Sequence, residues 1–213
     1  MFDPKSFESE YLNGVFDGKG KEYYLNTILK FEGEYFNGKW WNEKLFDYFS
    51  DETYELKNGN RYLKIYNNED LEFEGDFLNC EKNGKGKEYF CNVLIFEGGF
   101  LNGKRNGFGK LYNDYGQLVY EGHFSNNEKN GIGKLYDINR NIYYKDEFLF
   151  GKMNGKGKYY YPNGILEYEG AFIYDKPNGQ GKFYDEHGRL RYKGEFLMEI
   201  KIGKGKNIMK MEI

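Results

Sequence analysis

The sequence is poor in residues that cross-link or stiffen a small protein. Its 213 residues include two cysteines, Cys80 and Cys91, along with three prolines and two histidines. Two thiols do not make a disulfide framework. They either pair with each other or, as we expect, stay reduced inside a cell. Because proline is rare, the 29 glycines are the main source of turns, and many tight turns are expected.

Long apolar runs are also missing. No stretch approaches the ~20 apolar residues that a membrane helix needs, and residues 1–5 lack the basic and apolar regions of a signal peptide. The net charge of −3 provides no global attraction to nucleic acid or to a membrane. We therefore expect a cytoplasmic protein with no nucleic-acid partner. Attachment to a membrane or a cytoskeletal structure is a further interpretation.

Aliphatic residues are scarce, whereas aromatic residues make up 20% of the chain. A compact core of this length normally depends on aliphatic side chains. Here 22 tyrosines and 19 phenylalanines carry the apolar surface, although the mean hydropathy is only −0.88. This combination favours a thin structure with a high ratio of surface to volume.

A triplet of an aromatic residue, glutamate and glycine recurs along the chain. The spacing is 23 residues from Phe73 to Phe96 and 24 from Phe96 to Tyr120. We number each unit from its first aromatic residue as position 0. Position 4 is then usually aromatic, positions 11 and 13 glycine, position 14 lysine and position 16 tyrosine. Counting a degenerate unit near residue 54, about nine units start near residues 7, 31, 54, 73, 96, 120, 144, 168 and 192.

Each unit has the pattern of a β-hairpin. Positions 0, 2 and 4 alternate with polar residues, which indicates a strand with one buried face. The glycine at position 2 leaves room for the flanking rings to lie over the backbone. The stretch Asn102-Gly103-Lys104-Arg105-Asn106-Gly107 illustrates the turn that follows, and Asn and Gly tolerate the positive φ that such turns need. We expect positions whose numbers sum to 16 to pair, which would place the tyrosine at position 16 on the face of positions 0 and 4.

Single hairpins are marginal in water, so neighbouring units are expected to pair and to bury a continuous aromatic row. The predicted fold is all-β. Residues 1–213 are expected to form one array of tandem hairpins, stacked into an elongated, twisted antiparallel sheet.

One unit shows a family resemblance clearly. Tyr120-Glu121-Gly122-His123-Phe124, followed by Asn130-Gly131-Ile132-Gly133-Lys134-Leu135-Tyr136, resembles the repeat of the MORN (membrane occupation and recognition nexus) family. The resemblance covers roughly residues 7–208. It implies a solenoid of hairpins with an aromatic-lined groove, a scaffold role in membrane–cytoskeleton junctions, and acidic-phospholipid binding of the kind reported for several members. Asp146 and Ser9 depart from the pattern by replacing the glycine at position 2.

Catalytic patterns are weak throughout the sequence. The stretch from Gly98 to Arg105 nearly matches a phosphate-binding loop, but it ends in Arg where Ser or Thr would hold Mg²⁺. His123 and His187 occupy unrelated repeat positions and have no Cys or His at metal-binding spacing. We expect no enzyme activity, no catalytic residue, no cofactor and no metal.

The aromatic row is the main candidate for a binding site. A one-layer sheet is expected to leave part of this row in an open groove, and exposed apolar strips usually mark interaction sites. The function predicted first is therefore a non-enzymatic scaffold that presents the groove to a peptide or amphipathic helix of a protein partner. The candidate groove residues are Phe77, Phe96, Phe100, Tyr120, Phe124, Tyr144, Phe148, Tyr168 and Phe172.

Two series of basic residues offer a second interpretation. The lysines at position 14 either pair with the glutamates at position 1 across strands or form an anion-binding stripe. A further series, which begins with Lys39, lies at the turn tips, where each residue near an anionic membrane contributes ~1 kcal/mol. The alternative function is thus a peripheral module that binds acidic phospholipid. Its candidate residues are Lys82, Lys104, Arg105, Lys129, Lys152, Lys176 and Lys201.

Two further expectations concern weak points of the array. Residues 40–66 lack the paired glycines of the other units, so we expect a weak joint there. Residues 207–213 alternate apolar and polar side chains after the last hairpin. They either cap the aromatic row within one chain or meet a second copy, which would give a homodimer through a chain end.

Overall fold

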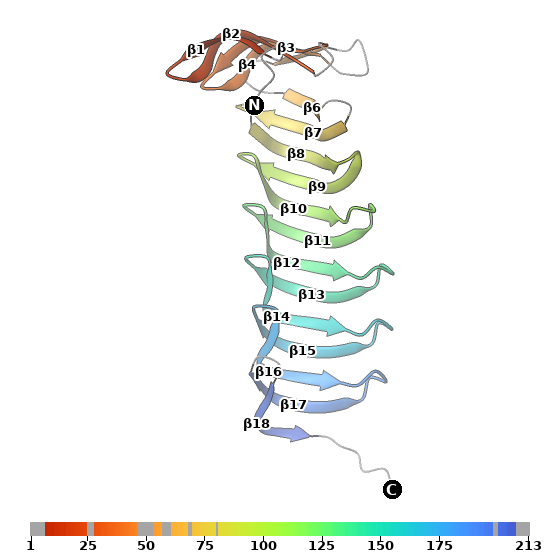
Figure 1. Cartoon of the computed structure of the whole chain (residues 1–213). Helices are drawn as coiled ribbons and strands as arrows, with labels where there is room; N and C mark the ends of the chain where they lie inside the picture. Colours follow the sequence, from red (N-terminus) through yellow and green to blue (C-terminus); the bar gives the residue numbers. More distant parts are fainter. Residues whose placement is uncertain are drawn as a thin grey trace. The chain divides into compact units, whose positions relative to one another are not determined.

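The computed structural model describes residues 7–24, 28–46, 53–56, 61–67, 70–79, 81–197 and 200–207. Their regular secondary structure consists of β-strands, each antiparallel to the strand with which it pairs (Figure 1). The predicted all-β fold of successive hairpins is confirmed. The chain divides into two compact units, residues 1–104 and residues 105–213.

Residues 1–104 contain two runs of paired strands. The first five strands form one sheet in sequence order, and pairing starts afresh at β6. The two strands of the degenerate third repeat, β5 and β6, therefore belong to different sheets. The strands are β1 (Phe7–Leu12), β2 (Val15–Tyr23), β3 (Leu29–Phe36), β4 (Lys39–Phe46), β5 (Thr53–Leu56), β6 (Arg61–Asn67), β7 (Asp70–Leu78), β8 (Glu81–Phe90) and β9 (Val93–Leu101).

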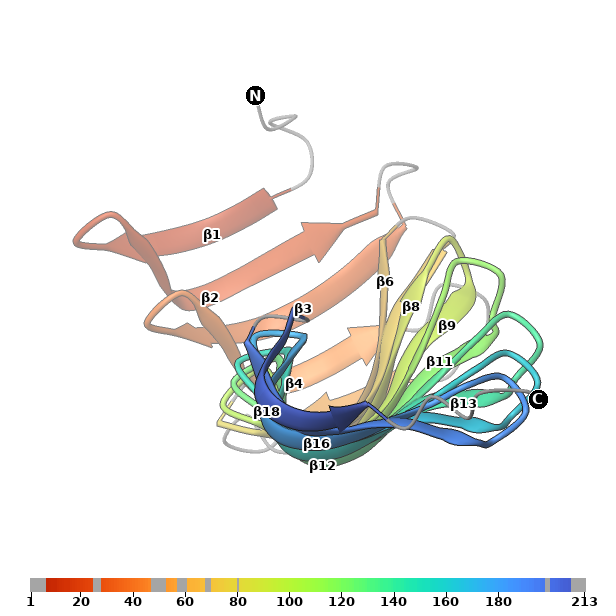
Figure 2. The same ribbon diagram turned by 90° about the horizontal axis from the view of Figure 1, so that it is seen from below.

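Residues 105–213 form a regular series of hairpins in which every strand pairs with its neighbours in sequence. In Figure 2 these strands lie behind one another and bend into a trough. The strands are β10 (Lys104–Tyr112), β11 (Leu118–Ser125), β12 (Glu128–Tyr136), β13 (Ile142–Leu149), β14 (Lys152–Tyr160), β15 (Leu166–Ile173), β16 (Lys176–Tyr184), β17 (Leu190–Leu197) and β18 (Ile200–Asn207).

The strand register corrects the expected pairing. Tyr120 lies opposite Leu135 within its own hairpin and opposite Leu111 of the preceding strand, so position 0 pairs with position 15. The reason is the two-residue turn between Ser125 and Glu128, which pairs position 5 with position 8, so that the paired positions next to the turn sum to 13. A bulge between Phe124 and Gly122 then raises the sum to 15 for the rest of the hairpin. Positions 0, 2, 4, 13 and 15 therefore share one side, here called the aromatic face. Positions 1, 3, 12, 14 and 16 share the other, here called the lysine face.

In residues 105–213, aromatic rings on the aromatic face form an unbroken chain of edge-to-face contacts from Phe124 to Tyr192. The Tyr144 ring lies 5.2 Å from both Phe148 and Phe172, and the Tyr168 ring lies 5.0 Å from Phe172 and Phe196. In residues 1–104, Phe73 and Phe100 meet in the same way at 5.3 Å. The Tyr120, Tyr144 and Tyr168 rings thus contact a ring of their own repeat and one of the next repeat, which stabilises the stack beyond area burial alone.

Glycine at positions 2 and 13 makes this ring packing possible. A Cβ on Gly133 would lie 2.5 Å from Cε2 of Tyr120, and one on Gly122 would lie 2.5 Å from the Cα of Gly133. The Tyr120 ring therefore rests directly on the backbone of two strands. Its hydroxyl donates to the carbonyl of His123 at 2.9 Å.

Two kinds of turn connect the strands, and sequence reasoning identified only the first. The hairpin turns place asparagine at positive φ in most units, as at Asn102 and Asn126. The loops between hairpins are built around an Asn or Asp side chain. Asp137 accepts from the amides of Asn139 and Asn141 at 2.9 and 2.8 Å.

Several expectations fall on residues outside the described ranges. These include residues 208–213, on which the self-cap and the homodimer depend, and Cys80. Cys91 carries a free, exposed thiol.

Candidate functional site

The nine candidate groove residues lie on the aromatic face, but their rings are covered. Eight of them are at most 4% exposed, and Phe77 is half-buried. The aromatic row was expected to lie partly open, but it is closed, because these rings pack against rings of the adjacent repeat. The eight covered residues are Phe96, Phe100, Tyr120, Phe124, Tyr144, Phe148, Tyr168 and Phe172.

A groove does exist above this ring layer, within residues 105–213. Its floor includes Tyr168 and Phe172, and its walls come from positions 9 and 15 of the repeats, which sequence reasoning did not single out. The signal for these walls is the pairing of position 9 with position 4 and of position 15 with position 0, as in Phe172 with Pro177 and Tyr168 with Phe183. The wall residues are Met153, Tyr159, Pro177 and Phe183.

Two carboxylates line the same groove. Burial raises the pKa of Glu167. Asp175 accepts a hydrogen bond from the backbone amide of Met153 at 2.8 Å and forms an ion pair with Lys152 at 2.9 Å. Burial also raises the pKa of Tyr168 to about 12, so this hydroxyl stays a donor, to the carbonyl of Ala171 at 2.9 Å. The groove is therefore aromatic with an acidic wall.

A second hollow lies within residues 1–104. It is lined by Trp40, Leu63, Phe73, Phe77 and Lys82, among others. The carboxylate of Glu22 lines it as well. This carboxylate accepts hydrogen bonds from the indole of Trp40 at 2.7 Å and from the hydroxyl of Tyr35 at 2.8 Å. The Glu22 carboxylate is thus already engaged by hydrogen-bond donors of the protein. Glu72 also lines the hollow, and its carboxylate accepts from the side-chain amide of Asn67 at 2.9 Å.

The turn-tip basic residues do not form one stripe. Neighbouring positions 8 and 9 of a strand face opposite sides, so the series splits. Lys104, Lys152 and Lys176 at position 8 are exposed. At position 9, Lys82 lies 4.4 Å from the Phe73 ring and Lys129 lies 5.3 Å from the Tyr120 ring, both on the aromatic face.

Burial lowers the pKa of Lys129, which fits its place over a ring instead of at the surface. Arg105 also occupies position 9 and is half-buried. The side chain of Lys201 lies outside the description. The basic residues at positions 8 and 9 face opposite sides because successive side chains of a strand alternate. The prediction of one basic series at the turn tips did not take this alternation into account.

The lysines at position 14 meet the glutamates at position 1, as one of the two interpretations expected. Lys21 and Glu32 lie 2.7 Å apart, Lys87 and Glu74 2.9 Å. Further along the chain, Glu169 contacts both Lys182, at 2.6 Å, and Lys158, at 3.8 Å.

Tyrosine at position 16 donates a hydrogen bond to the glutamate of these clusters. The expected register placed this tyrosine on the other face and so did not predict the contact. The hydroxyl of Tyr136 donates to Glu121 at 3.0 Å, and that of Tyr184 donates to Glu169 at 3.1 Å. Burial, and then the hydrogen bond to Glu121, raise the pKa of Tyr136 to about 12. The hydrogen bond from Lys182 lowers the pKa of Glu169. The tyrosines thus belong to the lysine face.

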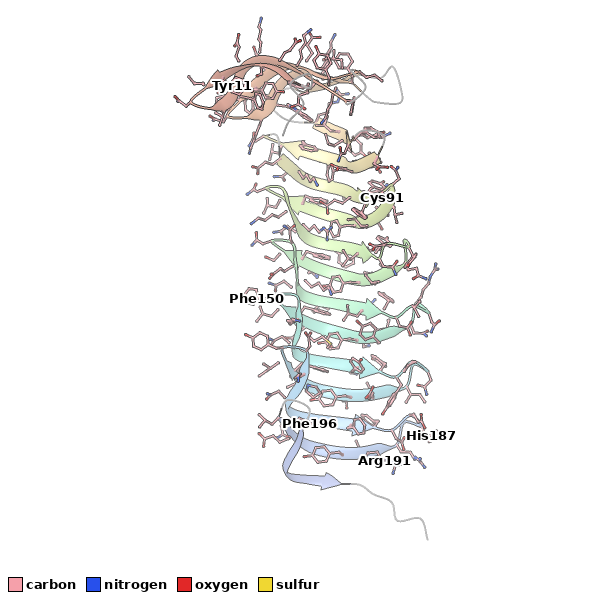
Figure 3. The ribbon with its side chains drawn as sticks, in the orientation of Figure 1. Tyr11, Cys91, Phe150, His187, Arg191 and Phe196 are labelled. Carbon is pink, nitrogen blue, oxygen red and sulfur yellow. The ribbon has the colours of Figure 1, made fainter. Side chains whose placement is uncertain are left out.

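The phosphate-loop-like stretch runs along β9, through a hairpin turn and into β10, so it precedes no helix. The His123 ring packs against Phe108, with 5.7 Å between the ring centres. His187 lies in a loop between hairpins, at the edge of the sheet away from the hairpin turn that holds Phe150 (Figure 3). In the described ranges, no three His, Cys, Asp or Glu side chains gather as metal ligands. The same ranges hold no helix long and apolar enough to cross a membrane.

Comparison with known sequences identifies the repeat. The family profile described as MORN repeat matches six segments that together cover more than half of the chain, at residues 7–26, 73–92, 96–117, 120–141, 147–165 and 168–186. No curated protein is detectably similar to the chain.

Proposed function

The chain belongs to the MORN-repeat family, and from this premise we propose that it is a non-enzymatic scaffold whose aromatic groove receives a segment of a protein partner. MORN repeats are commonly protein or lipid interaction modules. The observation that carries the proposal is the groove over Tyr168 and Phe172, walled by Met153, Pro177 and Phe183. The scaffold is proposed to act in the cytoplasm, at a membrane or cytoskeletal structure.

The chemistry of the groove defines the segment that would fit. The floor and walls offer aromatic, Met and Pro surface to apolar side chains, and sites of this kind take a few anchoring residues from an extended peptide or one face of a helix. Asp175 already pairs with Lys152, so Glu167 is the carboxylate that favours a basic residue next to those anchors. The proposed ligand is therefore a short segment with apolar anchors and one Lys or Arg.

Selection from a random peptide library on the whole chain tests the proposal. Peptides that bind are expected to combine apolar anchors with Lys or Arg. Their affinity would then be measured by fluorescence anisotropy against the wild type, Phe183→Ser and Glu167→Gln. Losing an apolar contact with a buried anchor typically costs about 1–2 kcal/mol or more of binding free energy. Phe183→Ser should therefore weaken binding by about tenfold or more.

Phe108→Ser is the matched control, because Phe108 is 53% exposed on the lysine face. It should leave the affinity unchanged. Selected peptides that bind Phe183→Ser as well as the wild type, or that show no basic residue, would contradict the groove proposal.

Acidic-phospholipid binding through turn-tip lysines is the second candidate. It is supported by the family, in which lipid interaction is common, and by the exposed position-8 residues Lys104, Lys152 and Lys176. At ~1 kcal/mol per residue, replacing all three with Gln should abolish salt-sensitive co-sedimentation with vesicles containing phosphatidylserine. Co-sedimentation that is unaffected by this replacement would remove the turn tips from the binding surface.

A further inference from the structure

The row formed by positions 1 and 14 runs across the sheets on the lysine face, with one residue from each strand. In residues 1–104 acid and base alternate along it. The register joins Glu8, Lys21, Glu32, Lys44 and Glu55 in one sheet, and Lys64, Glu74, Lys87 and Glu97 in the other. Each lysine therefore lies between glutamates or beside one, and the row is balanced.

The same row has a different composition in residues 105–213. Lys145 and Lys193 stand at position 1, where other repeats have glutamate. Lys145 is paired with lysine on both sides, by Lys134 on β12 and Lys158 on β14. From β10 to β17 the row reads Lys110, Glu121, Lys134, Lys145, Lys158, Glu169, Lys182 and Lys193, six lysines to two glutamates.

These lysines are accessible to a ligand. Lys134 and Lys193 are exposed, and the side chains of Lys158 and Lys182 are 43% and 40% exposed. Glu169 already contacts both of the latter, whereas Lys145 lies 5.9 Å from the centre of the Tyr160 ring. Like charges directly opposite each other on paired strands destabilise a sheet, so a counter-charge along the row would be stabilising.

A hollow accompanies the row between β13 and β17. Lys158, Lys182 and Lys193 line it together with Lys156, and the backbone of Gly157, Gly170 and Gly181 forms part of its lining. Asp146 and Glu169 are the carboxylates that line it. Positions 2 and 13 belong to the aromatic face, so at these glycines the hollow meets bare backbone on the lysine face, which a ligand chain can approach beside the lysines.

We propose that this lysine row is a docking site for an extended acidic peptide segment of a partner protein. The row is one residue wide, and its strands are spaced by ~4.8 Å, so it spans about 34 Å, the length of about ten extended residues. A single file of charges beside a hollow matches a linear chain. A flat lipid surface would also meet the neighbouring row at positions 3 and 12, which contributes the carboxylates of Glu147 and Glu195.

The docking site is independent of the aromatic groove. Strand alternation puts the two on opposite faces, and the residues that line the hollow and the groove do not overlap. Phe183→Ser, which is designed to disrupt the groove, should therefore leave binding to the lysine row unchanged.

The test uses a fluorescein-labelled decaglutamate peptide and the whole chain, with anisotropy measured at about 0.15 M salt, where the Debye length of about 8 Å screens turn-tip charges from a peptide on the row. Lys145→Glu/Lys193→Glu restores the alternation found in residues 1–104. It should bind at least about tenfold more weakly than the wild type. Lys152→Glu/Lys176→Glu makes the same change of net charge at the turn tips and should change the affinity by less than about twofold.

Three results would overturn the proposal. One is no saturable binding to the wild type, and another is an equal loss of affinity in both double variants. The third is tighter binding of phosphatidylserine vesicles or of a single-stranded oligonucleotide than of decaglutamate, with the same dependence on Lys145 and Lys193. Should the Glu variant fail to fold, Lys145→Gln/Lys193→Gln replaces it, with an expected loss of at least about threefold.

Discussion

At the scale of single residues, the aromatic ring at position 0 rests on the glycine at position 13 and, as at Tyr120 and Tyr168, on a second glycine at position 2. The ring of Tyr120 occupies the space where side chains of Gly122 and Gly133 would lie. Tyr144 and Tyr168 cover Gly157 and Gly181 in the same way. The recurring glycines are therefore packing residues as well as flexible ones.

Gly133→Ala should destabilise the protein markedly. The added methyl group would meet the Tyr120 ring and force it off its strand, and such overpacking typically costs ~1–3 kcal/mol. The measurement is the free energy of unfolding from urea titration. Lys134→Ala, one residue away on the lysine face, should stay within ~0.5 kcal/mol of the wild type. Equal urea midpoints for the two variants would show that the ring does not rest on Gly133.

Lys145→Glu should stabilise the protein. It replaces two like-charge pairs, with Lys134 and Lys158, by two opposite-charge pairs, each worth ~0.2–1 kcal/mol on a sheet. Urea titration at low salt should show the increase, and ~1 M NaCl should shrink it because salt screens exposed charges. A variant less stable than the wild type at low salt would refute the charge argument.

At the scale of elements, the hairpin turn is the part of the repeat with the clearest local rule. Asn13, Asn37, Asn79, Asn102 and Asn126 occupy its first position with φ near +50°. Phe150 and Tyr174 adopt φ of 49° at the same position, although aromatic residues rarely do so. Both are exposed, by 64% and 62%, and Phe150 projects from the turn edge in Figure 3.

Phe150→Asn should raise the free energy of unfolding by up to ~1 kcal/mol, because asparagine tolerates the left-handed conformation that costs other residues ~1–2 kcal/mol. Thermal or urea unfolding measures the gain. Tyr115→Asn serves as the control, since Tyr115 is 88% exposed but lies in a loop between hairpins. If both variants gain equally, loss of an exposed ring is the cause and the backbone argument fails.

At the scale of the whole chain, the main irregularity falls in the degenerate third repeat. Its first strand, β5, ends the five-stranded sheet, and its second strand, β6, begins the next. Leu63 of β6 nevertheless shares a buried cluster with Phe31 and Tyr35 of β3. Side-chain packing thus connects the sheets of residues 1–104 where strand pairing stops.

Amide hydrogen exchange should be faster in residues 40–66 than in residues 96–190. β5 and β6 each pair with one strand only, so half of their backbone groups lack the ladder that protects strands with two neighbours. Mass spectrometry of exchanged peptides measures the difference, with the peptide covering β12 and β13 as the internal reference. Uniform protection from residue 40 to residue 190 would contradict the weak joint.

The sequence by itself determined the repeat, its hairpin character and the family. The triplet led by Tyr120, the glycines at positions 11 and 13 and the Asn-Gly turns are local signals, and local signals are enough to specify strands and turns. It also determined which residues form the aromatic row, because period-2 alternation assigns them to one face.

Only the tertiary structure decided which residues meet across strands. A two-residue turn and one bulge set the sum of paired positions to 15, and this odd sum moves Tyr136 from the aromatic face to Glu121 on the other side. A shift of one residue exchanges the faces of a strand, so the ring-covered floor, the groove walls at Met153 and Phe183, and the lysine pairs around Lys145 follow from the register. The turn lies within one unit, but the bulge accompanies packing of the Tyr120 ring over two strands and against the next repeat, which local signals do not specify.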